Sequence, residues 1–119
     1  MSEPKGDDEI EKHAHHARTP VAVDAVAIEA AAGFFRAAGD PARLRLLVVL
    51  QQGEWCVTEL AASTGEGLST ISQRLRVLRN DGLVSRRREG KHLWYSLADA
   101  HVSELIANAL AHASEHRRK

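Results

Sequence analysis

The feature that most constrains the fold is a change of hydrophobic periodicity late in the chain. Up to that point apolar residues recur every three or four positions, which predicts helices. Beyond it, residues 83–88 and 91–97 alternate on either side of Glu89-Gly90, which predicts a hairpin with a two-residue turn. Short helices predicted at 58–63 and 69–81 directly precede the hairpin and are joined by a Gly-containing turn. This order is typical of a winged helix-turn-helix.

Further helices are predicted on both sides of this unit. A first helix is expected from Val21 to about Ala38, and a second over 41–52, where Asp40-Pro41 supplies an N-cap and a first-turn proline. Asp99 caps a last helix. The apolar stripe of this last helix comprises Val102, Leu105, Ile106, Ala109, Leu110 and Ala113. The predicted fold is mainly α with a small β-hairpin, in the order α-α-α-α-β-β-α.

Composition predicts one globular domain. Of the 119 residues, 44% are hydrophobic and 27% are charged, a balance that suits a packed core. Residues 1–20 have few apolar side chains and are expected to form a flexible, acidic, His-containing tail, which leaves 21–116 as the winged helix-turn-helix and dimerisation domain. No segment is apolar enough to span a membrane, and a single cysteine suits a reducing compartment. We therefore expect a cytoplasmic protein without a membrane partner.

Positive charge is concentrated on the predicted recognition helix and hairpin. Between Leu68 and His92 there are seven Lys and Arg residues against two Asp and Glu, which leaves +5 in a chain of zero formal net charge. Hydroxyl, amide and guanidinium groups on the recognition helix suit base edges, and cations at a hairpin tip suit phosphates. The candidate DNA-binding residues are Ser69, Thr70, Ser72, Gln73, Arg74, Arg76, Arg86, Arg87, Arg88 and Lys91.

The chain resembles the ArsR/SmtB family of metal-responsive bacterial repressors. Two runs carry the resemblance, FRAAGDPARLRLLVVL and WCVTELAASTGEGLSTISQRLRVLRNDGLVSRRREGKHLWYSL, and it extends over roughly residues 30–116. The resemblance implies a homodimer in which the first and last helices form the interface. It also implies a double-stranded operator with two-fold symmetry, and release of that DNA when metal binds.

The last predicted helix carries four candidate metal ligands. His101 and His112 lie on one helix face but about 16 Å apart along the axis, so one helix cannot bring both to one ion. Two antiparallel helices across a dimer axis would join Asp99 and His101 of one chain to His112 and Glu115 of the other. Two imidazoles and two carboxylates suit tetrahedral zinc. The spacing D-x-H-x₁₀-H-x₂-E also matches the ligand pattern of the family's zinc-sensing members.

Two further metal-binding possibilities stay open. His116 would add a fifth ligand if the metal were nickel or cobalt, which favour higher coordination numbers. A second site would combine Cys56 and Glu59 with a tail histidine. The resemblance implies a second cysteine in that region, where this chain has Thr58. The candidate tail ligands are His13, His15 and His16.

The expected function is repression by a metal-free dimer that zinc releases from its operator. The alternatives are a nickel- or cobalt-responsive regulator, or a winged-helix regulator that senses no metal. A metal carrier would not need a cationic hairpin. A zinc enzyme needs an open coordination position and a general base, whereas the four candidate ligands close the zinc shell and no H-E-x-x-H motif is present. We therefore expect no enzymatic activity.

Overall fold

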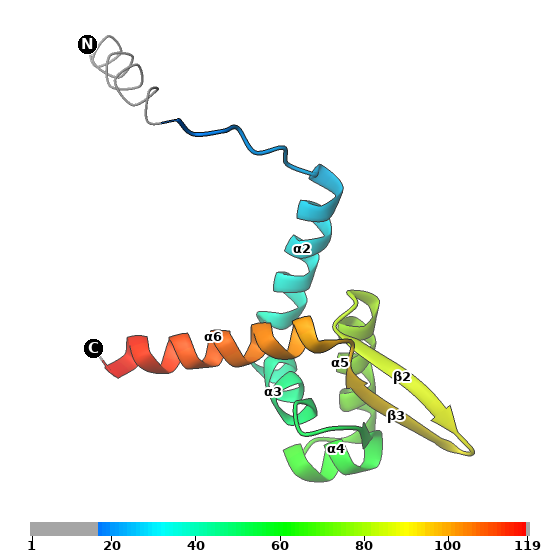
Figure 1. Ribbon diagram of the computed structural model, residues 1–119. Coiled ribbons are helices and arrows are strands. Elements are labelled where there is room, and N and C mark those ends of the chain that lie inside the picture. Colours follow the sequence, from blue (N-terminus) through cyan, green and yellow to red (C-terminus); the bar gives the residue numbers. More distant parts are fainter. Residues whose placement is uncertain (1–16, 119) are drawn as a thin grey trace.

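The computed structural model describes residues 17–118, and within them the chain forms five α-helices and three β-strands (Figure 1). The predicted tail, apart from residues 17–20, lies outside the described residues, and so do its three histidines. The elements are α2 (Ala25–Ala38), α3 (Pro41–Leu50), β1 (Trp55–Cys56), α4 (Val57–Thr64), α5 (Leu68–Asn80), β2 (Val84–Glu89), β3 (His92–Leu97) and α6 (Ala100–Arg118).

The three strands form one antiparallel sheet in the order β1-β3-β2. The prediction of helices with a small hairpin is confirmed, but β1 was not predicted, so the order of elements is α-α-β-α-α-β-β-α. β1 is only two residues long, and two residues show no alternation that a sequence pattern can detect. In the sheet Trp55 pairs with Tyr95 and Cys56 pairs with Trp94.

The first helix begins later than the sequence predicted, at Ala25 instead of Val21. Asp24 causes this start, because its Oδ1 accepts hydrogen bonds from the backbone N–H groups of Val26 (3.0 Å) and Ala27 (3.3 Å). An aspartate N-cap of this kind satisfies amides that the helix itself leaves unpaired. The three residues that precede Asp24 in the predicted helix, residues 21–23, therefore lie outside the helix.

Two other boundaries also differ from the prediction. α3 ends at Leu50 instead of Gln52. The N–H groups of Gln51 and Gln52 donate to carbonyls three residues earlier, whereas an α-helix requires carbonyls four residues earlier. The hairpin turn lies one residue further on, since Glu89 pairs with His92 and the central residues are residues 90 and 91. The first of these is Gly90, whose φ of +63° suits glycine at the first position of a type II′ turn.

The core is aliphatic and lies where α3, α4, α5 and the sheet meet. Ile71, Leu75 and Leu78 of α5 are completely buried, as their helical spacing predicts. Val102 and Ile106 attach the first half of α6 to this core. Within residues 17–118, no helix combines the length and hydrophobicity that crossing a membrane requires.

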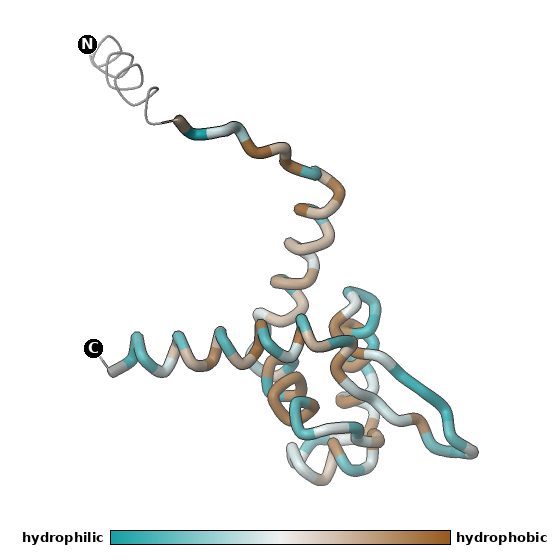
Figure 2. The backbone as a smooth tube through the Cα atoms, in the orientation of Figure 1, coloured by the Kyte–Doolittle hydropathy of each residue, from teal (hydrophilic) through white to brown (hydrophobic). Residues whose placement is uncertain are grey.

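Most of α2 and the second half of α6 extend away from the packed body (Figure 1). Figure 2 shows hydrophobic residues on α2 and on the segment that leads into it, outside that body. We call the exposed apolar residues of these two helices the arm surface; they are Val26 (78% exposed), Ile28 (55%), Phe35 (59%), Leu105 (36%) and Leu110 (36%). Exposed apolar surface of this extent marks an interaction site.

Both projecting helices are fixed to the body through α3. Arg43 caps the end of α2, since its Nε donates to the Ala37 carbonyl (2.7 Å) and its Nη2 to the Arg36 carbonyl (3.2 Å). At the other end of α3, Gln51 Nε2 donates to the Ser103 carbonyl of α6 (3.0 Å). The directions in which α2 and α6 leave the body are therefore set by hydrogen bonds as well as by packing.

Candidate nucleic-acid interface and metal ligands

α4 and α5 form a helix-turn-helix. Gly65 ends α4 with a φ of +75°, a left-handed conformation that glycine adopts without strain. One face of α5 packs into the core, and the opposite face is polar and open to solvent. The predicted DNA-binding residues exposed on it are Ser69, Thr70, Ser72, Gln73 and Arg76. Side chains of these types form hydrogen bonds with base edges when such a helix enters the major groove.

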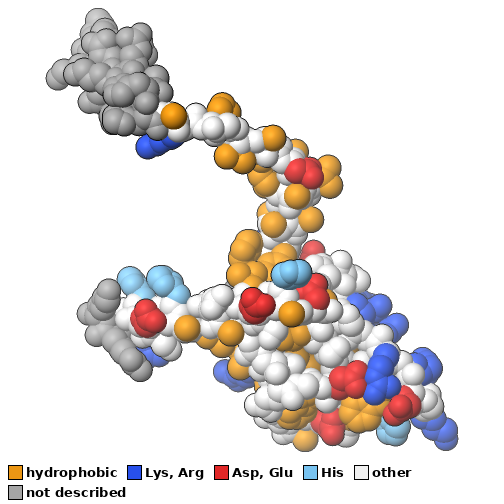
Figure 3. All heavy atoms as spheres, in the orientation of Figure 1, with side chains coloured by type: hydrophobic (Ala, Val, Ile, Leu, Met, Phe, Trp, Pro, Cys, Tyr) orange, Lys and Arg blue, Asp and Glu red, His pale blue; other side chains and the backbone are white. Residues whose placement is uncertain are grey.

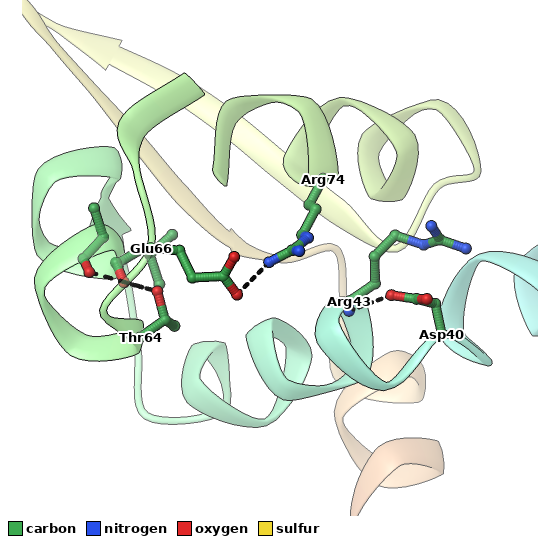
Figure 4. Close-up of polar contacts among 7 residues, drawn as sticks. Asp40, Arg43, Thr64, Glu66 and Arg74 are labelled. Atoms are coloured by element: carbon green, nitrogen blue, oxygen red, sulfur yellow. Dashed lines mark hydrogen bonds and ion pairs between the residues drawn. The ribbon is translucent and has the colours of Figure 1, made fainter. Parts of the chain in front are cut away.

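Arg74 differs from the other predicted DNA-binding residues of α5. Its side chain is only 26% exposed and forms an ion pair with Glu66 in the turn between α4 and α5. Figure 4 shows this pair, along with the bond between the Arg43 amide and Asp40. Arg74 therefore joins α5 to the turn that precedes it, and its charge is partly neutralised.

The hairpin formed by β2 and β3 carries exposed cations. Blue side chains gather over this hairpin and the nearby end of α5 in Figure 3. Arg86, Arg88 and Lys91 are exposed, and within residues 17–118 no carboxylate forms an ion pair with them. Groups of this kind at a hairpin tip can neutralise DNA phosphates.

Arg87 is held by carboxylates of the protein itself. Its Nε and Nη2 donate to the two oxygens of Glu54, each at 2.8 Å, and its Nη1 lies 3.3 Å from Glu89 Oε2. The hydrogen bonds from Arg87 lower the pKa of the Glu54 carboxyl below its ordinary value, and the same pair raises the pKa of Arg87. Arg87 therefore stays charged and paired.

Two of the predicted metal ligands, Asp99 and His101, are neighbours at the start of α6. Asp99 Oδ1 accepts the Val102 N–H at 3.0 Å, as predicted for an N-cap, and lies 3.8 Å from His101 Nδ1. Ligands on tetrahedral zinc are about 3.3 Å apart, so a small movement would let this pair share one ion. The His101 side chain is 96% exposed. It is therefore open to groups from another molecule.

The other predicted ligands lie toward the far end of α6. His112, Glu115 and His116 are all exposed, and the rings of His112 and His116 stack with centroids 6.3 Å apart. Figure 3 shows histidine side chains near both ends of this helix. Within one chain, residues 17–118 contain no group of three or more His, Cys, Asp or Glu placed to hold a metal ion. The four predicted ligands are thus divided between the two ends of α6, as the eleven-residue spacing of the histidines requires.

Cys56 and Glu59, proposed for a second metal site, are brought together at the junction of β1 and α4. Glu59 Oε1 accepts the Cys56 backbone N–H at 3.0 Å, which places its carboxylate beside this half-buried residue. Thr58 is exposed next to them. The tail histidines that would complete such a site lie outside the described residues.

Glu54 and Glu66 were not singled out from the sequence. The predicted net charge of +5 was counted over residues 68–92 alone, and both glutamates precede that range. Glu66 precedes Arg74 by only eight residues, so the sequence alone could have suggested an ion pair across the turn between α4 and α5. Glu54 is 33 residues from Arg87, and only the sheet order brings the two together.

Comparisons with known proteins identify the family. The model of the ArsR family of bacterial regulatory proteins matches residues 40–86, from the end of the α2–α3 turn into β2. The transcriptional regulator NmtR of Mycobacterium tuberculosis is 41% identical over 99 residues, which span 83% of this chain and 82% of that protein. The chain belongs to the ArsR family. An SmtB repressor homologue of Synechocystis is 45% identical over 84 residues, or 71% of this chain and 64% of that protein.

Solved structures of similar proteins show the same fold. The homodimeric winged helix-turn-helix DNA-binding domain of Mb0332 from Mycobacterium bovis superposes with a TM-score of 0.76 and 34% identity, over 84% of this chain and 93% of that one. Apo-NmtR gives a TM-score of 0.67 and 38% identity over 83% of each chain. The winged helix-turn-helix prediction is confirmed. As an ArsR-family member the chain is a DNA-binding transcriptional regulator and not an enzyme.

Proposed function

We propose that this ArsR-family protein is a repressor that binds operator DNA as a metal-free dimer and leaves it when zinc binds between the subunits. The observation that carries the proposal is the placement of Asp99 and His101 at one end of α6 and of His112 and Glu115 near the other. Each pair is exposed, and within residues 17–118 no third His, Cys, Asp or Glu joins either pair in a group that could hold a metal ion. A second, antiparallel copy of α6 would complete both.

The arm surface supports the dimer on which this site depends. Ile28 and Phe35 are seven residues apart and lie on one face of α2, while Leu105 and Leu110 are exposed on α6. A second copy of the chain is the partner that would cover both helices at once. The resulting interface would be isologous, with the same residues contributed by each subunit.

In the dimer, two copies of α5 would enter successive major grooves of an operator with two-fold symmetry, about 34 Å apart. The exposed hydroxyl and amide groups of α5 would contact base edges, while Arg86, Arg88 and Lys91 would contact phosphates. We infer that the protein acts in the cytoplasm, where this DNA is found.

Zinc would supply a cross-link between the two subunits, and two carboxylates with two imidazoles are a donor set that it accepts. The chain itself provides a route from this site to the DNA-binding surface. Gln51 of α3 donates to the Ser103 carbonyl of α6, and α3 in turn packs against α5. A change in the position of α6 would therefore move the body that carries the recognition helix.

A nickel- or cobalt-responsive regulator is the second candidate. It is favoured by the stacking of His112 on His116, because His116 would add a ligand for metals that take more than four. The absorption intensity of the cobalt form distinguishes the two candidates, since tetrahedral cobalt absorbs much more strongly than octahedral cobalt.

Zinc is expected to lower operator affinity by about 5- to 150-fold, the range typical of coupling between two sites on one protein. The measurement is a fluorescence anisotropy titration of a duplex of about 30 bp, selected from a random pool, with and without saturating zinc. Addition of a chelator should restore the metal-free affinity. Equal affinity in both conditions would contradict a zinc-released repressor and would leave a metal-independent DNA-binding regulator.

A further inference from the structure

We propose that Arg87 is a positioning residue, which fixes the hairpin through Glu54 and does not itself contact DNA. This inference rests on the proposed function of the hairpin in binding DNA phosphates. It separates Arg87 from its two arginine neighbours, with which it forms one continuous basic run in the sequence, Arg86-Arg87-Arg88.

In the ion pair between Arg87 and Glu54, the planar guanidinium group donates two parallel hydrogen bonds to one carboxylate. Two nitrogens of Arg87 meet the two oxygens of Glu54 at 2.8 Å each, and a third lies 3.3 Å from Glu89. Parallel bonds of this type fix orientation as well as distance, and lysine cannot reproduce them. A phosphate would have to displace Glu54 to obtain the same contacts.

The pair spans the sheet. Glu54 directly precedes β1, whereas Arg87 lies in β2, and β3 runs between these two strands. The register places Trp94 of β3 opposite both Cys56 and Arg87. The ion pair therefore crosses the central strand and ties the outer strand of the hairpin to the residue that directly precedes β1. A hairpin joined only at its base would have no such restraint on its direction.

The neighbouring arginines lie on the other face of β2. Successive side chains of a strand alternate between faces, so Arg86 and Arg88 share a face with their partners Tyr95 and Leu93. Both arginines are exposed, and neither pairs with a carboxylate in the part of the chain that the structure describes. These two can contact phosphate without giving up a protein partner.

The two possible functions of Arg87 predict opposite effects of Glu54→Gln. If Arg87 contacts phosphate, removing a competing anion frees the arginine and raises DNA affinity. If Arg87 positions the hairpin, Glu54→Gln breaks the restraint and lowers affinity, even though it removes a negative charge from a DNA-binding protein. We expect Glu54→Gln and Arg87→Gln each to lower affinity by about three- to tenfold, with little further loss in the double variant.

Arg87→Lys keeps the positive charge at this position but removes the planar guanidinium that donates to both Glu54 oxygens. Lysine still binds phosphate as a point charge, so a phosphate contact would survive this change with little loss. The positioning function requires the planar guanidinium. We therefore expect Arg87→Lys to bind DNA as weakly as Arg87→Gln.

Salt dependence provides the third readout, with Arg86→Gln as the matched control. Each lost phosphate contact makes the slope of log affinity against log salt shallower by about 0.9. Arg86→Gln removes one contact from each subunit, so the slope for this dimer should become shallower by about two. Arg87→Gln should keep the wild-type slope. All titrations use the full-length dimer and one selected duplex of about 30 bp. Thermal melts by circular dichroism verify that each variant is folded.

Two results would overturn the inference. One is higher affinity in Glu54→Gln, and the other is a slope in Arg87→Gln that falls as much as in Arg86→Gln. Either result leaves the proposed function intact, provided that the wild-type dimer binds the duplex and Arg86→Gln lowers the slope. If the wild-type protein binds no duplex, the proposed function itself fails.

Discussion

Ile28→Asp is expected to convert the dimer into a monomer and to lower operator affinity by at least about 100-fold, because binding of two linked half-sites is lost. Ile28 is 55% exposed on α2, where it belongs to the arm surface and contributes nothing to the buried core. Two-fold symmetry places the new carboxylate in the interface twice, and a buried charge without a partner opposes association. Sedimentation velocity measures the change in oligomeric state, and anisotropy measures the loss of DNA binding.

The matched control for Ile28→Asp is Ala62→Glu, which adds the same charge at an exposed position of α4. This variant should remain dimeric in sedimentation. Both variants should unfold cooperatively, since neither change touches the core. A dimer that persists in Ile28→Asp with unchanged DNA affinity would show that α2 is not part of the interface.

His101→Ala and His112→Ala are each expected to abolish the release of DNA by zinc while leaving metal-free DNA binding unchanged. The proposed dimer has two equivalent intersubunit sites, and each variant removes one of the four ligands from both of them. The loss in zinc affinity should exceed the roughly 10- to 100-fold that follows removal of an outer-shell partner alone. The predicted DNA-binding residues belong to α5 and the hairpin, whereas both histidines belong to α6. Competition with a chromophoric chelator measures the zinc affinity.

Two controls keep this prediction specific. His92→Ala removes a histidine from β3, and Glu104→Gln removes a carboxylate from α6, and neither residue belongs to the proposed ligand set. Both variants should bind zinc as the wild type does. If His101→Ala and His112→Ala still release DNA at wild-type zinc concentrations, the metal acts elsewhere, and the pair of Cys56 and Glu59 becomes the next site to test.

The parts of the fold that could be predicted from sequence are those with a strong local pattern. The helical spacing of Ile71, Leu75 and Leu78 identified the buried face of α5, and the alternation around Gly90 identified the hairpin. The two-residue strand β1 has no such pattern, so it was missed. Missing β1 also concealed the contact between Glu54 and Arg87, because this contact depends on the sheet order and not on sequence distance.

The predicted metal ligands show a different limit of sequence-based prediction. Helix geometry applied to the spacing of His101 and His112 was enough to predict that one chain would keep them apart. Helical spacing alone would place Asp99 and His101 on different faces, but Asp99 is the non-helical N-cap and can turn back, and it lies 3.8 Å from His101. Convergence of the two pairs is a property of two chains, and a second chain is needed to test it.

The most direct test of the intersubunit site uses mixed dimers, in which one subunit carries His101→Ala and the other carries His112→Ala. They are isolated with two different affinity tags, neither of them polyhistidine. If each site combines His101 of one chain with His112 of the other, one site in the mixed dimer has lost both histidines and the other is intact. We therefore predict one tightly bound zinc per mixed dimer and none in either variant homodimer. A mixed dimer that binds no zinc would contradict the account.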